Sequence, residues 1–275
     1  MSKRIFHIIF ISISVLVSVT LKGQNINNQI DSLNATALLI HTDTTLQGRL
    51  TADSLFTRQL ILFLKQKNSF LIDFSKMNAI KVVVAPDQSF KIFTWHLELA
   101  DGTYRQRGAI QINVPNQSLQ LIPLFDQSDF TLTPERGLQD AKHWCGAVYY
   151  DIIPLQMNGI KLYTLLGYDE YAKGITRKII EVMHFENGQP IFGGDYFSYP
   201  KDPTYPLPPC DRWVMQYKKG SNASITWIAA QNSIEVSELT STSNDWKDPS
   251  TWVPTGLFMN FQWINGKWTM KPNKN

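Results

Sequence analysis

The first periodic hydrophobic pattern in the chain predicts a helix. Apolar residues recur at intervals of three to four positions between residues 53 and 66, namely Leu55, Phe56, Leu60, Phe63 and Leu64. This is the spacing of one helix face. Thr51 or Asp53 is placed to cap the start of the helix, because both side chains accept hydrogen bonds from free backbone amides. Residues 25–50 mix polar residues with short apolar runs and carry little periodic signal.

From Ile80 onward the pattern is that of β-strands. Short runs of β-branched and aromatic residues alternate with turn signals, which is typical of β-rich proteins. Four tight-turn pairs stand between apolar alternating runs: Asp101-Gly102, Asn158-Gly159, Asn187-Gly188 and Asn265-Gly266. Such pairs favour two-residue hairpin loops. Counting outward from these turns sets Met157 opposite Ile160, Leu155 opposite Leu162, and Trp263 opposite Trp268.

These patterns together predict an α+β chain. We expect mainly antiparallel β-structure, a meander or sandwich, with a short N-terminal helical region. The predicted divisions are a leader over residues 1–23, a helical region packed on the sheet over 24–78, and a β-rich domain over 79–275. The segment 144–194 is apolar on both faces in places, so a second sheet or the N-terminal helix is expected to cover it.

The stretch WHLELADGTYRQRG, residues 95–108, is the densest in groups that could do chemistry. With Asp101-Gly102 as a two-residue loop, Leu97 faces Gln106 and Trp95 faces Gly108. Glu98 then lies opposite Arg105, and His96 opposite Arg107. Cross-strand charge pairs of this kind are ordinary on a half-solvated hairpin. We interpret these residues as the solvent-exposed face of a hairpin, and a binding or catalytic role is the alternative.

The N-terminus has the composition of a secretory signal peptide. Lys3 and Arg4 precede an apolar run over residues 5–21, which is shorter than a membrane-spanning helix needs. A small residue, Gly23, follows near the expected cleavage point. We therefore expect an exported protein, in the periplasm, on the cell surface or in the medium, with no membrane span after cleavage. An uncleaved N-terminal anchor is the alternative.

The leader also accounts for the positive charge of the chain. It contains Lys3, Arg4 and Lys22 and no acid, so 23 of the 26 basic residues remain beside 23 acidic ones. A nearly neutral protein without a Lys/Arg run lacks the electrostatic footprint of a nucleic-acid-binding protein. Nucleic acid is therefore not an expected partner.

The two cysteines, Cys145 and Cys210, are expected to form a disulfide if the chain is exported. Closing a loop of this length would restrict the unfolded chain by about 4 kcal/mol in the chain-entropy model. Two buried free thiols are the alternative interpretation.

The candidate binding residues are two Trp residues in one loop and two Asp residues elsewhere in the chain. The segment NDWKDPSTWVPTG, residues 244–256, places Trp246 and Trp252 in polar surroundings, where an indole pair could stack on sugar rings or cover the edge of a core. Asp195 and Asp211 are candidate acids for glycoside hydrolysis, which uses two carboxyl groups. No short catalytic motif occurs in the chain, and the scattered His residues predict no metal site. We expect no cofactor.

Several segments resemble a family of exported Bacteroidetes proteins of unassigned activity. The resemblance rests on VVVAPDQSFKIFTWHLELADGTYRQRGAIQ, YYDIIP, KLYTLLGYDEYAKGITRKIIEVMHF and PIFGG, and on the later DRWVMQYKKGSNASITW and NFQWINGKW. It covers roughly residues 70–270. The resemblance implies export and a β-rich fold, and it supplies no activity and no functional residues.

The expected function is accordingly a non-catalytic binding or interaction module of the cell envelope, with an envelope protein or a glycan as its partner. The alternative is a carbohydrate-binding or carbohydrate-active protein. In that case Trp246 and Trp252 form the sugar platform and Asp195 or Asp211 supplies the acid.

Overall fold

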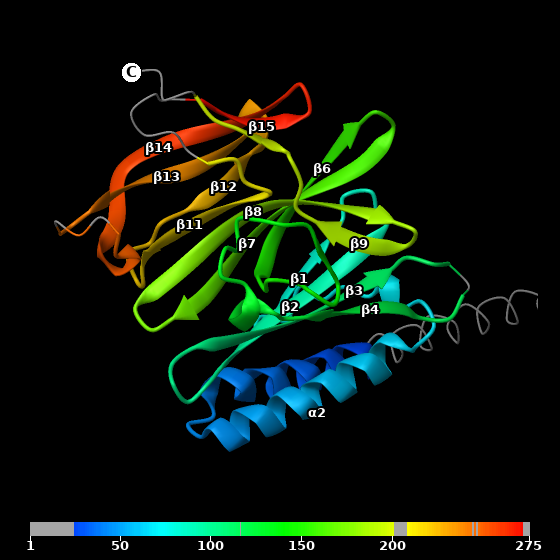
Figure 1. The fold of residues 1–275 in the computed structure, drawn as a ribbon. Coiled ribbons are helices and arrows are strands. Elements are labelled where there is room, and N and C mark those ends of the chain that lie inside the picture. The colour runs from blue at the N-terminus through cyan, green and yellow to red at the C-terminus, as the bar shows by residue number, and fades with distance from the viewer. Residues whose placement is uncertain (1–24, 116, 201–207, 244, 246, 272–275) are drawn as a thin grey trace, which may run out of the picture. The chain divides into compact units, whose positions relative to one another are not determined.

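The computed structural model describes residues 25–115, 117–200, 208–243, 245 and 247–271. The predicted leader over residues 1–23 lies outside them. The chain divides after Ala79 into two compact units, one helical and one built of strands (Figure 1). In the described part of the chain, no helix is long and apolar enough to cross a membrane.

The described residues of the first unit form two α-helices and a short 3-10 helix, η1 (Ser69–Leu71). One spans residues 25–42, and the second, α2, spans Leu46–Leu64. Ile30, Leu33, Ala37 and Ile40 of the first helix are buried at intervals of three and four. The Gln66 side-chain amide donates to Gln29 Oε1 over 2.8 Å, and Asn34 Oδ1 accepts the backbone amides of Asn78 and Ala79. These bonds connect the first helix to a residue shortly after the end of α2 and to the C-terminal end of the unit.

The predicted helix over 53–66 is confirmed, but it begins earlier than expected. Its cap is Thr45, whose hydroxyl accepts the amide of Gly48 over 3.0 Å, and neither Thr51 nor Asp53 has this role. Asp43 holds this cap in place, because its carboxylate accepts both the amide and the hydroxyl of Thr45. The turn Asp43–Thr45 therefore sets the helix start, and the hydrophobic pattern registered only the later turns.

The second unit contains three sheets. The first has the order β1-β2-β3-β4, from strands Lys81–Val84, Phe90–Glu98, Tyr104–Ile112 and Gln120–Phe125. The central sheet has the order β5-β9-β8-β7-β6, from Gln139–Asp140, Gln189–Phe192, Ile175–Glu186, Ile160–Ala172 and Val148–Met157, and β11 (Arg212–Lys218) pairs with β8. The third has the order β10-β15-β14-β13-β12, from Phe197–Ser198, Lys267–Lys271, Trp252–Ile264, Ser233–Ser241 and Ile225–Ile228. The pairs between these strands are antiparallel except β10 with β15, so the predicted fold class is confirmed.

The central sheet is buried on both faces. Leu165 and Ile179 belong to a hydrophobic cluster with Phe90 and Ile110 of the first sheet. The next residues along each strand, Leu166 and Ile180, belong to a second cluster with Phe261 and Trp268 of the third sheet. Successive side chains of a strand point to opposite faces, so one run of apolar residues supplies two cores. Figure 1 shows β7 and β8 between the two outer sheets.

Three of the four predicted hairpins have the expected register. Met157 pairs with Ile160, Glu186 with Gln189, and Trp263 with Trp268. In each turn both Asn and Gly have positive φ, as a two-residue type I′ loop requires. The rings of Trp263 and Trp268 lie 5.4 Å apart with their planes at 66°.

The register predicted for residues 95–108 is wrong by one position. Trp95 pairs with Arg107, Leu97 with Arg105, and Glu98 with Tyr104. Gly102 alone of the Asp101-Gly102 pair has positive φ, and the amide of Leu99 donates to the carbonyl of Thr103. The loop therefore has three residues, a common hairpin form with glycine in the left-handed position. Arg105 consequently pairs with Asp129 over 2.5 Å and not with Glu98.

Candidate binding cleft

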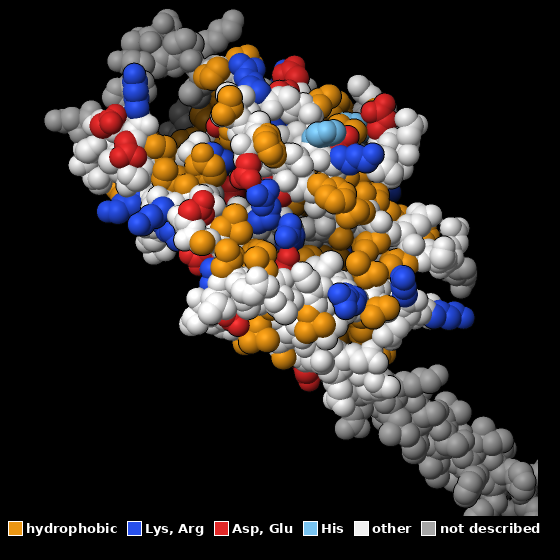
Figure 2. All heavy atoms as spheres, turned by 60° about the horizontal axis from the view of Figure 1, so that its bottom comes forward, with side chains coloured by type: hydrophobic (Ala, Val, Ile, Leu, Met, Phe, Trp, Pro, Cys, Tyr) orange, Lys and Arg blue, Asp and Glu red, His pale blue; other side chains and the backbone are white. Residues whose placement is uncertain are grey.

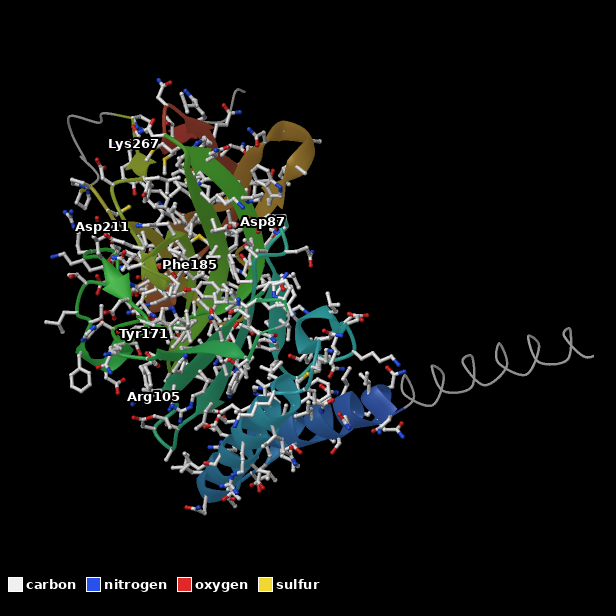
Figure 3. All side chains as sticks on the ribbon, turned by 90° about the vertical axis from the view of Figure 1, so that its right-hand side faces the viewer. Asp87, Arg105, Tyr171, Phe185, Asp211 and Lys267 are labelled. Atoms are coloured by element: carbon white, nitrogen blue, oxygen red, sulfur yellow. The ribbon has the colours of Figure 1, made fainter. Side chains whose placement is uncertain are left out.

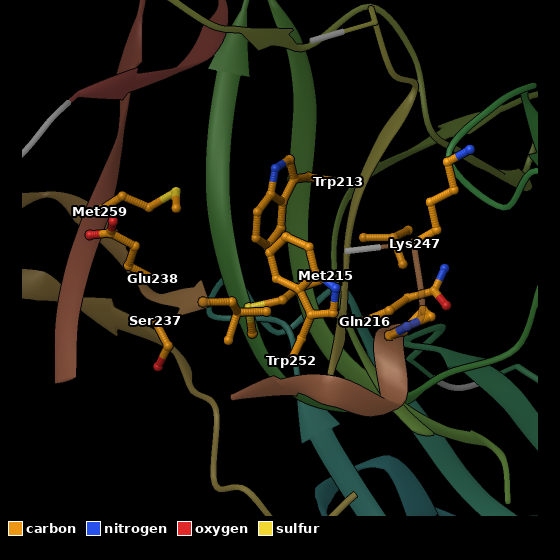
Figure 4. Close-up of a pocket in the computed structure, with 11 residues that line it drawn as sticks. Trp213, Met215, Gln216, Ser237, Glu238, Lys247, Trp252 and Met259 are labelled. Atoms are coloured by element: carbon orange, nitrogen blue, oxygen red, sulfur yellow. The ribbon is translucent and has the colours of Figure 1, made fainter. Parts of the chain in front are cut away.

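A cleft of about 400 Å³ opens beside β11, β13 and β14. Its apolar wall comprises Trp213 and Met215 of β11, Leu239 of β13, Trp252 and Met259 of β14, and Pro249 in the loop before β14. Gln216, Ser237, Glu238 and Lys247 add polar groups. In the view of Figure 4, Glu238 and Lys247 lie on opposite sides of the two indoles. The cleft can therefore take a ligand with an apolar face and polar edges.

The loop before β14 is held by local hydrogen bonds that place Trp252. Asp248 caps a short 3-10 helix, η4 (Pro249–Thr251), by accepting the amide and hydroxyl of Ser250. The amide of Thr242 donates to the carbonyl of Thr251 over 2.9 Å. Trp252 follows directly, opposite Ser241 of β13. The side chain of Trp252 is thus fixed at the cleft by the strand pair that begins there.

Strand β11 lines the cleft with four consecutive residues, Trp213 to Gln216. Side chains alternate between the faces of a strand, so four in a row can border one cleft only if it runs along the edge of the strand. Val214 shows this directly, because its side chain packs on the cluster at the opposite face of the central sheet. The backbone of β11 is therefore part of the cleft wall.

The residues predicted from sequence are only partly brought together. Trp252 lines the cleft, and Trp246 lies outside the described residues. Asp195 is exposed and pairs with Lys267 over 2.8 Å, while the carboxylate of Asp211 accepts the amide of Gly137 over 2.7 Å. Neither Asp lines the cleft; Asp211 and Lys267 can be located in Figure 3. Of the described residues in the predicted set, Trp252 alone lines this cleft.

Trp213 is the functional candidate that the sequence analysis missed. It lies in the segment RWVMQYK, whose alternating apolar and polar residues predict an ordinary strand. Its ring packs on Phe261 at 5.5 Å, while Met215 beneath it is buried. The position of β11 at the edge of the central sheet, beside β8, brings this indole to the same cleft as Trp252.

The predicted disulfide is wrong, because Cys145 and Cys210 are both free and buried. Cys210 belongs to the cluster shared with the third sheet, whereas Cys145 follows Trp144 of the cluster on the other face. The Tyr199 hydroxyl lies 2.5 Å from Cys210 Sγ. Burial raises the pKa of Cys145 to about 12 and that of Cys210 to about 11. The thiols therefore behave as small apolar core groups.

A buried ion pair stands at the start of β11. Arg212 and Glu181 are fully buried, with the Arg212 Nε 3.1 Å from Glu181 Oε2. The two Nη atoms of Arg212 donate to the carbonyls of Pro134 and Gly137, over 2.6 and 3.1 Å. Tyr149 donates its hydroxyl hydrogen to Glu181, and burial beside that carboxylate raises the pKa of Tyr149. This network joins the 134–137 loop to the central sheet and leaves no opening for a ligand.

A second cluster of buried polar side chains surrounds Asp169, near the end of β7. Asp169 Oδ1 accepts the Gln106 side-chain amide over 2.7 Å and the backbone amide of Tyr171 over 2.8 Å. The guanidinium of Arg177 lies 3.9 Å from Asp169 Oδ2 and stacks on the Tyr171 ring. Burial outweighs these contacts and raises the pKa of Asp169 to about 6. Arg105 and Tyr171 are labelled in this region of the β-rich unit in Figure 3.

In the dense stretch around His96, the contacts that the structure describes are ring contacts and an ion pair. The His96 ring lies edge-on to Tyr104 at 5.2 Å and to Tyr168 at 6.1 Å. Glu98 is exposed, and Arg105 is taken up by Asp129. Within the described ranges, no three His, Cys, Asp or Glu residues are grouped so that they could hold a metal ion.

Comparison with known proteins gives no relative from which a function could be transferred. No family model, no curated protein and no solved structure matches the chain. The resemblance to exported Bacteroidetes proteins stays a prediction, and the cleft is the feature on which a function can be argued.

Proposed function

We propose that the protein is an exported, non-catalytic binding module of the cell envelope and that the cleft beside β11 is its ligand site. The observation that supports this best is the convergence of Trp213 and Trp252 on one cleft, from strands 39 positions apart. Indole rings supply large apolar contact area with little loss of side-chain freedom, and they dominate many binding sites.

The polar residues of the cleft support binding better than hydrolysis. Glycoside hydrolysis uses two carboxyl groups that face each other across the scissile bond. Of the described residues that line the cleft, Glu238 is the one acid. Asp195 and Asp211 are engaged with Lys267 and Gly137.

Carbohydrate is the second candidate ligand class, and the same indole pair favours it. Sugar rings present apolar C–H faces that stack on aromatic side chains, while Gln216, Glu238 and Lys247 could contact hydroxyl groups. This alternative keeps Trp252 from the predicted platform and replaces the other member with Trp213.

The cleft is lined by one acidic and one basic residue, Glu238 and Lys247, which agrees with a ligand surface that is uncharged or of mixed charge. Basic and acidic side chains are interspersed on the face shown in Figure 2, without a large surface patch of one charge. Binding of a nucleic-acid phosphate backbone would need a positively charged patch.

A photocrosslinking experiment in the native envelope tests the proposal. A photoreactive amino acid at Glu238 should capture an envelope component, and the same group at exposed Lys161, away from the cleft, should not. Trp213→Ala and Trp252→Ala should each abolish capture. Trp227→Ala is the matched control, because Trp227 is a partly exposed indole on β12 that does not line the cleft. Equal capture from Lys161, or capture unchanged in both cleft variants, would refute the cleft as the site.

A further inference from the structure

We propose that the cleft binds an extended peptide segment of a partner protein, which adds as a strand to the free edge of β11. This inference rests on the proposed function and names the ligand class of the same cleft. Strand addition uses backbone hydrogen bonds for affinity and side-chain pockets for selectivity.

One edge of β11 has no partner strand among the described residues. Within the described ranges, β11 pairs with β8 and with no other strand. The amide of Lys219 donates to Gly174 on the β8 side, whereas that of Arg212 turns the other way, to Glu135. Backbone groups alternate in direction along an antiparallel strand. Val214 and Gln216 therefore direct their N–H and C=O groups outward, as Arg212 does.

These outward groups face the cleft. Glu135 occupies the edge at Arg212, and the cleft begins immediately beyond, at Trp213. Val214 and Gln216 both line it. One residue of an extended peptide could exchange two hydrogen bonds with Val214, and the next but one could do the same with Gln216.

The opposite wall of the cleft is a second strand edge. Strand β12 pairs with β13 as far as Val236, and the amide of Ser237 still donates to the carbonyl of Ser224 over 2.9 Å. Glu238 and Leu239 lie beyond this pairing, and both line the cleft. The amide of Thr242 turns toward β14, and alternation then directs the backbone groups of Leu239 and Ser241 away from β14. A strand-shaped ligand thus meets backbone donors and acceptors on both sides.

The side chains define what such a peptide should look like. Trp213 and Met215 project to the same side of β11 and belong to one cluster with Met259 and Trp252. Every second residue of an added strand would point to this apolar wall. Exposed Glu238 and Lys247 border the cleft, so the intervening peptide residues should be polar or of mixed charge.

The test begins with a phage-displayed library of random linear peptides selected on the full protein. We expect a consensus in which apolar and polar positions alternate. Synthetic consensus peptides should lose about tenfold or more in affinity when one alternate set of backbone amides is N-methylated, because each methyl removes one donor. Methylation of the other set should have a much smaller effect. Equal affinity of all N-methylated peptides would overturn the proposal.

Two variants of one residue separate the backbone from the side chain. Val214→Pro removes an outward amide that does not donate to β8, and proline is tolerated at such edge positions. It should abolish peptide binding. Val214→Ala keeps the amide and shortens a side chain that packs on the opposite face. It serves as the reference for the side chain, and Val214→Pro should lose far more affinity for the peptide than Val214→Ala. Unchanged binding by Val214→Pro would refute strand addition; if that variant does not fold, the N-methylated peptides still decide.

A glycan array measured in parallel distinguishes a failure of the peptide inference from a failure of the proposed function of the cleft. Glycan binding that is lost in Trp213→Ala, without peptide selection, would overturn the peptide inference and keep the cleft as a binding site. No peptide, no glycan and no crosslinked component would overturn both.

Discussion

At the residue scale, the two buried carboxylates of the central sheet differ in how they are compensated. Glu181 lies against the guanidinium of Arg212, whose remaining donors are taken by backbone carbonyls. Asp169 is also buried, but Arg177 stands 3.9 Å away and burial dominates its pKa. The first carboxylate therefore has a close cation and further donors around it, whereas burial raises the pKa of the second to about 6.

We expect Arg212→Ala to destabilise the protein strongly. It leaves the Glu181 carboxylate buried without its cation, a change that typically costs about 3–5 kcal/mol in free energy of unfolding. Lys267→Ala is the control, because its partner Asp195 is exposed and such surface pairs contribute about 0–1 kcal/mol. Urea unfolding of the two variants measures the difference. Similar small effects for both would contradict the assigned role of Arg212.

Asp169 should make stability depend on pH in a defined direction. Its pKa in the folded protein, about 6, lies above its ordinary value of 3.8, so the folded state holds a proton that the unfolded chain has already released. Stability contributed by this group is full below about pH 4 and is lost as the pH rises to about 6, by on the order of 3 kcal/mol. Unfolding curves across that range should show the decline, and Asp169→Asn should flatten it. A variant with the same slope as the parent would assign the pH dependence to other groups.

At the element scale, the hairpins show what local sequence can specify. Each Asn-Gly turn accommodates two positive φ angles, and the register of the flanking strands follows from it. Asp101-Gly102 failed as a predictor because only Gly102 adopts a positive φ, while Asp101 accepts the amide and hydroxyl of Thr103. The hydrogen bonds from Thr103 to the Asp101 side chain stabilise a three-residue loop, one residue longer than predicted. Every cross-strand pair of this hairpin is therefore shifted by one residue from the predicted register.

The doubly buried strand β7 gives a prediction of its own. Leu165 and Leu166 are both fully buried but belong to different cores. Leu165→Ala and Leu166→Ala should each cost about 2–5 kcal/mol in free energy of unfolding, since both leave cavities in packed surroundings. In a two-layer sheet only one of the two would be costly. Leu257→Ala, at a side chain that is 60% exposed, should change stability by less than about 0.5 kcal/mol.

At the scale of the whole molecule, export is the prediction that the structure leaves open. The basic and apolar leader predicts a mature chain that starts near Gln24. Mass spectrometry of protein recovered from the periplasm or the medium should find that start. A chain that retains residues 1–23 and sediments with membranes would favour the N-terminal anchor instead.

The sequence by itself determined the α+β class, the change from helix to strands near residue 80, the positions of the turns and the register of three hairpins. These features depend on contacts between residues close in the chain, where turn chemistry and side-chain periodicity act directly. The first helix, over residues 25–42, escaped notice because its buried positions include small Ala37 among polar neighbours.

Only the tertiary structure decided the candidate site and the state of the cysteines. Trp213 and Trp252 meet because β11 joins the central sheet at an edge while β14 lies in the third sheet. Cys145 and Cys210 stay apart because their neighbours pack on opposite faces of the central sheet. Which strands become neighbours is set by the burial of whole faces, summed over many residues distant in sequence. A local pattern carries apolar or polar character but not the identity of the surface that covers it.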